Sequence, residues 1–181
     1  MALYAGAVLE GLTGLTVTGN GADVARYRSS SIGSSETWKS FGLPYVVESW
    51  IYVRGAASPV LTIEPGVVVK FNGGQGMSIG FDGTPGGLVA VGTAEQPIRF
   101  TSNAATVAAG QWGRIEIHAP AVAGTRIANA VVEGGGAGSD GGVVVHGGAP
   151  VLQSVTFQKN RGSGVRVSGG TPTISACTVT A

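Results

Sequence analysis

Two consecutive stretches near the end of the chain repeat one pattern: Gly142-Val-Val-Val-His-Gly-Gly-Ala-Pro-Val-Leu-Gln-Ser-Val-Thr-Phe157 and Gly164-Val-Arg-Val-Ser-Gly-Gly-Thr-Pro-Thr-Ile-Ser-Ala-Cys-Thr-Val179. They align without a gap at an offset of 22 residues. In each stretch, two bursts of alternating apolar residues flank a Gly-Gly-x-Pro corner. A repeat of this length, made of period-two strands and tight corners, is typical of a β-solenoid in which each repeat forms one coil.

Equivalent strands recur further upstream. Ile115 precedes Val143 by 28 residues, and the extra residues lie in the corners, where a solenoid tolerates insertions. Near the start of the chain, Leu12, Leu15 and Val17 have the spacing of the apolar residues in the last coils. We also expect four pairings between neighbouring coils in the middle of the chain: Leu61 with Leu88, Ile63 with Ala90, Val69 with Ile98, and Phe71 with Phe100.

The composition excludes several classes of protein. A content of 43% hydrophobic and only 12% charged residues does not fit a disordered chain. A formal net charge of +1 gives no electrostatic basis for binding nucleic acid or an anionic membrane. The apolar N-terminus has no basic region and is too short to span a bilayer, so we expect no membrane insertion. The single cysteine, Cys177, falls on an inward position and is expected to be a small buried apolar residue.

Three stretches carry a resemblance to a known family: Leu61-Thr-Ile-Glu-Pro-Gly-Val-Val-Val-Lys-Phe71, Gly87-Leu-Val-Ala-Val-Gly-Thr-Ala-Glu-Gln-Pro-Ile-Arg-Phe-Thr-Ser102, and the coil that begins at Trp112-Gly113. They resemble the right-handed parallel β-helix repeat proteins of bacteria, which have the pectate-lyase-like fold and are secreted or attached to the cell surface. We therefore predict an all-β, right-handed parallel β-helix (β-solenoid) of about five to six coils. It would form a single domain over residues 1–181, with residues 28–58 as an irregular excursion that caps or covers one side or end. Within that segment the aromatic residues are expected to cover the apolar edge of the first coil or, alternatively, to form a sugar-stacking platform: Trp38, Tyr45, Trp50 and Tyr52.

The repeat alignment places His118 and His146 at equivalent outward positions on adjacent coils, about 4.8 Å apart. Two imidazoles can begin a metal site, but a third ligand is needed, and only Glu116 on the same strand face offers itself. We expect surface or crevice histidines here, with no metal and no cofactor.

Lyases of the fold that the chain resembles use Arg or Lys together with Asp, often with calcium. One outward row could form a basic stripe with a carboxylate for an acidic sugar: Arg99, Arg114, Glu116 and Arg166. None of the three aspartates lies in a strand that could present a calcium cage: Asp23, Asp82 and Asp140. We therefore expect solvated side chains rather than a catalytic site.

The leading functional hypothesis is a non-catalytic structural or adhesive solenoid segment of a bacterial extracellular or surface protein, exported by a signal outside this chain. Its expected partner is itself, by end-to-end association or through neighbouring coils of a longer chain. The ends would be formed by apolar residues of the first and last coils: Leu12, Leu15, Val17, Ile174, Cys177 and Val179. The alternative is a polysaccharide lyase or a carbohydrate-binding β-helix.

Overall fold

The protein is all-β. The computed structural model describes residues 3–5, 23–138 and 141–180, and within them every regular element is a β-strand. All pairings between these strands are parallel. The described part of the chain contains no helix that is long and apolar enough to cross a membrane.

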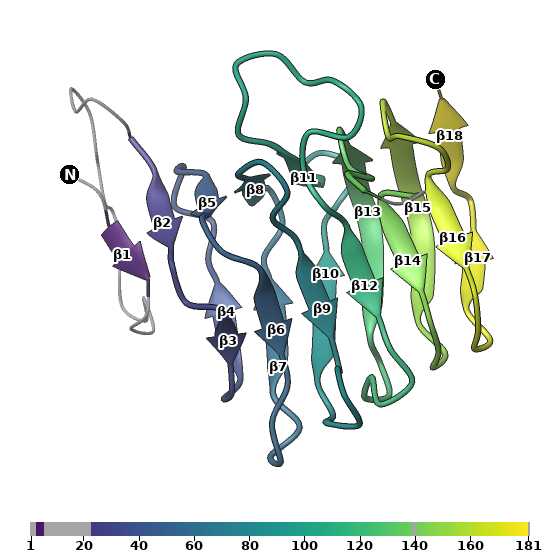
Figure 1. Ribbon diagram of the computed structural model, residues 1–181. Helices are drawn as coiled ribbons and strands as arrows, with labels where there is room; N and C mark the ends of the chain where they lie inside the picture. The colour runs from purple at the N-terminus through teal and green to yellow at the C-terminus, as the bar shows by residue number, and fades with distance from the viewer. Residues whose placement is uncertain (1–2, 6–22, 139–140, 181) are drawn as a thin grey trace.

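The strands form two sheets that run along the molecule in sequence order (Figure 1). The first sheet has twelve strands: β1 (Leu3–Ala5), β2 (Ala25–Tyr27), β4 (Glu36–Trp38), β5 (Tyr45–Val47), β7 (Val60–Ile63), β8 (Val68–Phe71), β10 (Gly87–Val91), β11 (Ile98–Ser102), β13 (Arg126–Glu133), β15 (Val151–Gln158), β17 (Thr173–Ser175) and β18 (Thr178–Thr180). The second sheet has six: β3 (Ser31–Ile32), β6 (Ile51–Val53), β9 (Met77–Ile79), β12 (Ile115–Ile117), β14 (Val143–Val145) and β16 (Val165–Val167).

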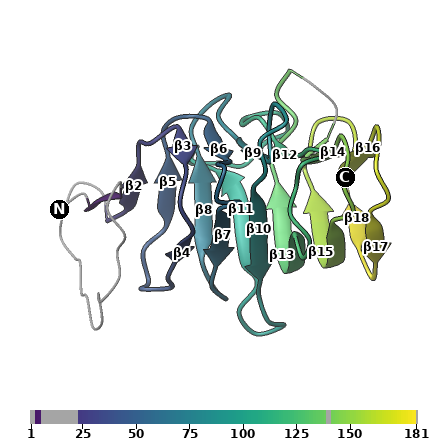
Figure 2. The same ribbon diagram turned by 90° about the horizontal axis from the view of Figure 1, so that it is seen from below.

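The first sheet bends at its two long strands, β13 and β15, and we call the parts on either side of the bend its two wings. The first half of β13 pairs with β10 and its second half pairs with β11. The residues between the halves of β13 and β15, Asn129 and Ser154, have φ values of 46° and 52°. A single left-handed residue turns the backbone without ending the strand, so successive residues on either side pair with different neighbours. The chain therefore passes the second sheet and both wings in turn, an arrangement compatible with a β-solenoid and visible along the stack in Figure 2.

Apolar columns fill the interior, and three of them, one from each set of stacked strands, run through nearly the whole stack. Strand alternation turns every second side chain inward, and parallel pairing places each one beside its equivalent in the next strand. The column of the second sheet runs through Ile32, Val53, Ile79, Ile117, Val145 and Val167. The columns of the two wings are Trp38, Ile63, Ala90, Ile127, Leu152 and Ile174, and Ala25, Tyr45, Val69, Phe100, Val132, Phe157 and Val179. All members except the last of each column are buried.

The register of the C-terminal half confirms the repeat alignment. Ile115 pairs with Val143 and Val143 with Val165, and Leu61 pairs with Leu88 as predicted. The pairing predicted between β8 and β11 is wrong by two residues. The structure pairs Val69 with Phe100 and Phe71 with Ser102. A shift of two residues keeps every side chain on the same face, so hydrophobic alternation alone cannot detect it.

The segment 28–58 is more regular than the predicted excursion, because four strands, β3 to β6, lie within it and pair in both sheets. Trp38 and Tyr45 are members of the interior columns, 2% and 1% exposed. Their rings stack with centroids 4.8 Å apart and 5° between planes. These two aromatic residues are therefore part of the core. The predicted end residues Leu12, Leu15 and Val17 lie outside the described residues.

The bend at Ser154 gives a test of this architecture. Ser154 is exposed, so its substitution acts through the backbone. We expect Ser154→Val to lower the free energy of unfolding by about 1–2 kcal/mol, because a β-branched side chain is strained at positive φ. Ser154→Gly is the matched control and should lower it by less than about 0.5 kcal/mol or raise it. Urea unfolding measures both values, and equal losses for Val and Gly would contradict the bend.

Candidate functional site

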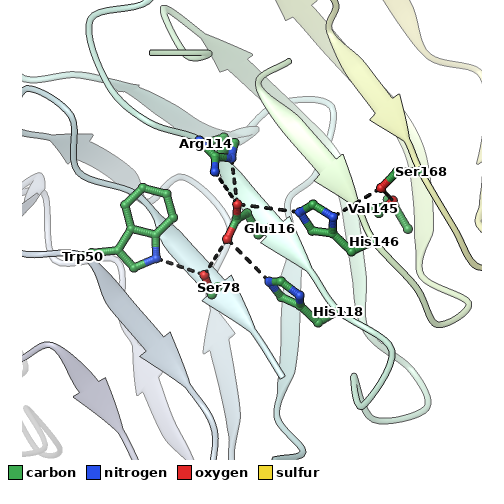
Figure 3. Close-up of polar contacts among 8 residues, drawn as sticks. All are labelled: Trp50, Ser78, Arg114, Glu116, His118, Val145, His146 and Ser168. Atoms are coloured by element: carbon green, nitrogen blue, oxygen red, sulfur yellow. Dashed lines mark hydrogen bonds and ion pairs between the residues drawn. The ribbon is translucent and has the colours of Figure 1, made fainter. Parts of the chain in front are cut away.

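A cluster of polar and aromatic side chains gathers on the outer face of the second sheet, around Glu116 in the middle of β12 (Figure 3). The register that aligns the interior columns also aligns this face: Ser78 of β9 pairs with Glu116. We call the following residues the Glu116 cluster: Trp50, Ser78, Arg114, Glu116, His118, His146 and Ser168.

Both carboxylate oxygens of Glu116 have hydrogen-bond donors. Ser78 Oγ donates to Oε2 at 2.9 Å, and Arg114 Nε donates to Oε1 at 2.7 Å. Burial by itself would raise the pKa of Glu116, but the Ser78 hydroxyl, the Arg114 guanidinium and the nearby His118 together hold it below its usual value. Glu116, 7% exposed, is therefore ionised at neutral pH, and its carboxylate oxygens are hydrogen-bond acceptors.

Trp50 and Ser78 hold this carboxylate in position. Trp50 Nε1 donates to Ser78 Oγ at 2.9 Å, and Ser78 is fully buried. The Arg114 guanidinium lies over the indole ring, 5.5 Å from its centroid. The indole therefore supports both groups that hydrogen-bond to Glu116.

The two histidines stack as the repeat alignment predicts, with ring centroids 4.7 Å apart and 18° between planes. Both rings point Nε2 toward Glu116, at 3.4 Å from Oε2 for His118 and 3.6 Å from Oε1 for His146 (Figure 3). Phe81 packs edge-on against His118 at 5.1 Å. Burial lowers the pKa of His118 and outweighs the opposite effect of Glu116, so His118 is neutral at pH 7.

The basic stripe predicted from the sequence does not come together. Arg114 is paired with Glu116, whereas Arg99 lies on β11 of the other sheet and is paired with Glu133. Arg166 lies on β16, in the same outward row as Glu116 but two strands further along. Of the predicted site residues, the structure groups four: Arg114, Glu116, His118 and His146.

Sequence reasoning missed Ser78, Trp50 and Ser168. Ser78 is paired with Glu116 across 38 residues, because a long corner separates β9 from β12. This corner breaks the repeat spacing, so the alignment could not place Ser78 beside Glu116. Ser168 was detectable, since it occupies the position of His146 one repeat later.

A second buried carboxylate, Glu133, lies on β13 and is 1% exposed. Its Oε1 accepts hydrogen bonds from Arg99 Nε and Thr101 Oγ1, both at 2.8 Å, and its Oε2 accepts one from Gln158 Nε2 at 2.7 Å. These partners hold the pKa of Glu133 below its usual value against the effect of burial, which would raise it. Its donors come from β11 and β15, the strands on either side of β13, so Glu133 links three layers of the stack.

Comparison with protein-family models found no match to this chain. Searches of curated proteins and of solved structures likewise found no match. The site is therefore interpreted from its own geometry.

Ser78→Ala tests the cohesion of the Glu116 cluster. The substitution leaves the Trp50 N–H and one Glu116 oxygen without their shared partner, so we expect a loss of about 1–3 kcal/mol in the free energy of unfolding. Denaturant unfolding followed by Trp fluorescence measures the loss. Ser175→Ala on exposed β17 is the control and should change the value by less than about 0.5 kcal/mol. Equal effects of the two variants would show that the hydrogen bonds of Ser78 contribute nothing.

The lowered pKa of Glu133 predicts a dependence of stability on pH. Its contribution is fully present above the unfolded value of 4.5 and is lost as the pH falls through the lower pKa of the folded state. We expect Glu133→Gln to reduce the acid-induced loss of stability between about pH 5 and pH 2. Glu95→Gln, in an exposed loop, is the matched control and should keep the wild-type profile. Thermal unfolding at a series of pH values measures the profiles, and a Glu133→Gln profile identical to wild type would contradict the prediction.

Proposed function

We propose that this chain is a non-catalytic structural or adhesive segment, a right-handed parallel β-helix of about five to six coils that associates end to end with a second copy of itself. The observation that carries the proposal is the way in which the three interior columns end. Their last members are Val167, Ile174 and Val179, which are 48%, 44% and 66% exposed. These three are the large hydrophobic residues exposed in the described part of the chain.

This exposed layer contrasts with the layer beneath it. Val145, Leu152 and Phe157, one strand earlier in each column, are at most 1% exposed. Burying a side chain of this size contributes about 1.5–3 kcal/mol, so covering all three is strongly favoured. One further layer of strands would give the last layer the burial that the layer before it already has.

The edge formed by β16, β17 and β18 favours addition of strands. Each of these strands pairs on one side only, with β14 or β15. Proteins protect such edges with charges and prolines; between residues 164 and 180 the chain has one charged residue, Arg166, and one proline, Pro172, which lies outside the strands. Unpaired backbone groups and apolar side chains therefore point in the same direction, along the stack.

A second copy is the occupant best supported by the sequence. Leu12, Leu15 and Val17 have the same spacing as Leu152, Val155 and Phe157, so one chain can present to the next an apolar row like its own. Head-to-tail stacking of this kind is heterologous and produces filaments if the rotation does not close. We place the protein outside the cell or on the bacterial surface, as proteins with the resembled repeats are.

The polysaccharide lyase is the weaker proposal. Both arginines that would bind an acidic sugar beside Glu116 and Glu133 are already paired with those carboxylates. A carboxylate whose pKa is held below its usual value is a poor base for removing a proton from a sugar.

The proposal is tested by the size of the particle as a function of concentration. We expect wild-type protein to form higher oligomers in analytical ultracentrifugation as its concentration rises. Val179→Lys should raise the protein concentration needed for association at least tenfold. Val179 is 66% exposed, so the substitution leaves the core intact, which circular dichroism checks. Thr178→Lys, on the opposite face of β18, is the matched control.

A strictly monomeric wild type over the whole concentration range would contradict self-association and leave a following coil of a longer chain as the occupant. Association that is unchanged in Val179→Lys would show that the contact lies elsewhere.

A further inference from the structure

The Glu116 cluster contains a set of potential metal ligands that the proposed function does not use. Glu116, His118 and His146 each offer one ligand atom, and these atoms all lie within 4.8 Å of one another. Two imidazoles and one carboxylate are a common ligand set for divalent transition metals, and a further position remains for water.

The distances fit coordination better than direct hydrogen bonding. Two ligands bound at about 2.1 Å to one ion in tetrahedral geometry are about 3.4 Å apart. The Nε2 atom of His118 lies 3.4 Å from Oε2 of Glu116, and that of His146 lies 3.6 Å from Oε1. The second distance is too long for a hydrogen bond, and the first is at the weak limit. The three ligand atoms lie within 4.8 Å of one another, so small side-chain movements bring them to the spacing of a bound set.

The other ring nitrogen of His146 is held as it is in metal sites. Ser168 Oγ donates to the carbonyl of Val145 at 3.2 Å and lies 3.2 Å from His146 Nδ1. When the hydroxyl hydrogen is donated to the carbonyl, Oγ can accept a hydrogen bond from Nδ1–H of His146, and in that tautomer the lone pair of Nε2 faces Glu116. Such a contact fixes tautomer and ring orientation in metal-binding histidines.

Glu116 is oriented in the same way. Ser78 and Arg114 each occupy one side of the carboxylate, and a carboxylate has about four acceptor positions. The remaining positions face the two imidazoles (Figure 3). In the Nδ1–H tautomer of His146, a cation between Nε2 and Glu116 would be bound by lone pairs of both.

The positive charge of Arg114 decides which class of ion fits. Because Arg114 neutralises Glu116, the cluster has little net negative charge to attract Ca²⁺ or Mg²⁺. Imidazole nitrogen favours Zn²⁺, Cu²⁺ and Ni²⁺. The His118 and His146 side chains are 19% and 39% exposed, so an ion can enter from solvent, and the His146 ring can turn toward it.

We propose that Glu116, His118 and His146 form a binding site for a divalent transition-metal ion of the zinc class, in which Ser168, Ser78 and Arg114 are positioning residues. The ion would link β12 to β14, two consecutive strands of the second sheet. This proposal is independent of end-to-end association, because the cluster lies on the outer face and not at the end of the stack.

Isothermal titration calorimetry with ZnCl₂ at about pH 7.5, on tag-free protein treated with a chelator, tests the site. We expect one ion per chain, at least tenfold weaker binding in His118→Ala and in His146→Ala, and no binding in the double variant. Ser168→Ala should weaken binding by about tenfold while all three ligands remain. CaCl₂ should give no binding.

Binding of Zn²⁺ can be assigned to the cluster directly, because the chain has two histidines and one cysteine. Cys177→Ser and Arg99→Ala, which lie away from the cluster, are the controls and should keep wild-type affinity. As a second readout, ¹⁵N spectra of the imidazoles should show both Nε2 resonances shifting on addition of Zn²⁺. Circular dichroism of the ion-free variants checks that each one folds.

The proposal is overturned if the wild type shows no heat and no imidazole shift at millimolar ZnCl₂. It is equally overturned if the double histidine variant binds Zn²⁺ with wild-type affinity, or if only one Nε2 resonance shifts.

Discussion

Parallel, in-register pairing of each strand with its equivalent one layer earlier is the interaction on which this structure depends. It brings Leu152 under Ile127 and Phe157 under Val132, so short strands that could bury little alone build continuous columns. A strand of three residues is not stable by itself, and its stability comes from the layers on both sides. The same dependence makes the last layer distinctive, because β16, β17 and β18 have a neighbouring layer on one side only.

The register that stacks apolar residues inside also stacks polar residues outside. Ser78 is aligned with Glu116, and the histidines that follow β12 and β14 come to lie one strand spacing apart. The Glu116 cluster is therefore a consequence of the repeat, with Trp50 and Arg114 added from the corners. Glu133 shows the same rule in the other sheet, where donors from the strands on either side of β13 converge on one buried carboxylate.

The repeats alone predicted the all-β class, the register of β12, β14 and β16, and the stacking of His118 on His146, because each depends on local spacing. Three features could not be predicted from the spacing of the repeats. The register between β8 and β11 differs by an even number of residues, which leaves the pattern of faces unchanged. The partnership of Ser78 with Glu116 crosses a corner of irregular length. The strands β3 and β4 are too short to stand out from a Ser-rich sequence, and only their neighbours define them.

We propose that the layer of β16, β17 and β18 is open in the single chain and is covered by a second copy. Native-state hydrogen exchange of the backbone amides tests it most directly, because protection reports how well each layer is covered. We expect strong protection in β12 and β13 at every protein concentration, and weak protection of residues 165–180 that rises as the concentration increases. Protection of 165–180 that equals that of β13 in dilute protein, or that does not change with concentration, would contradict it.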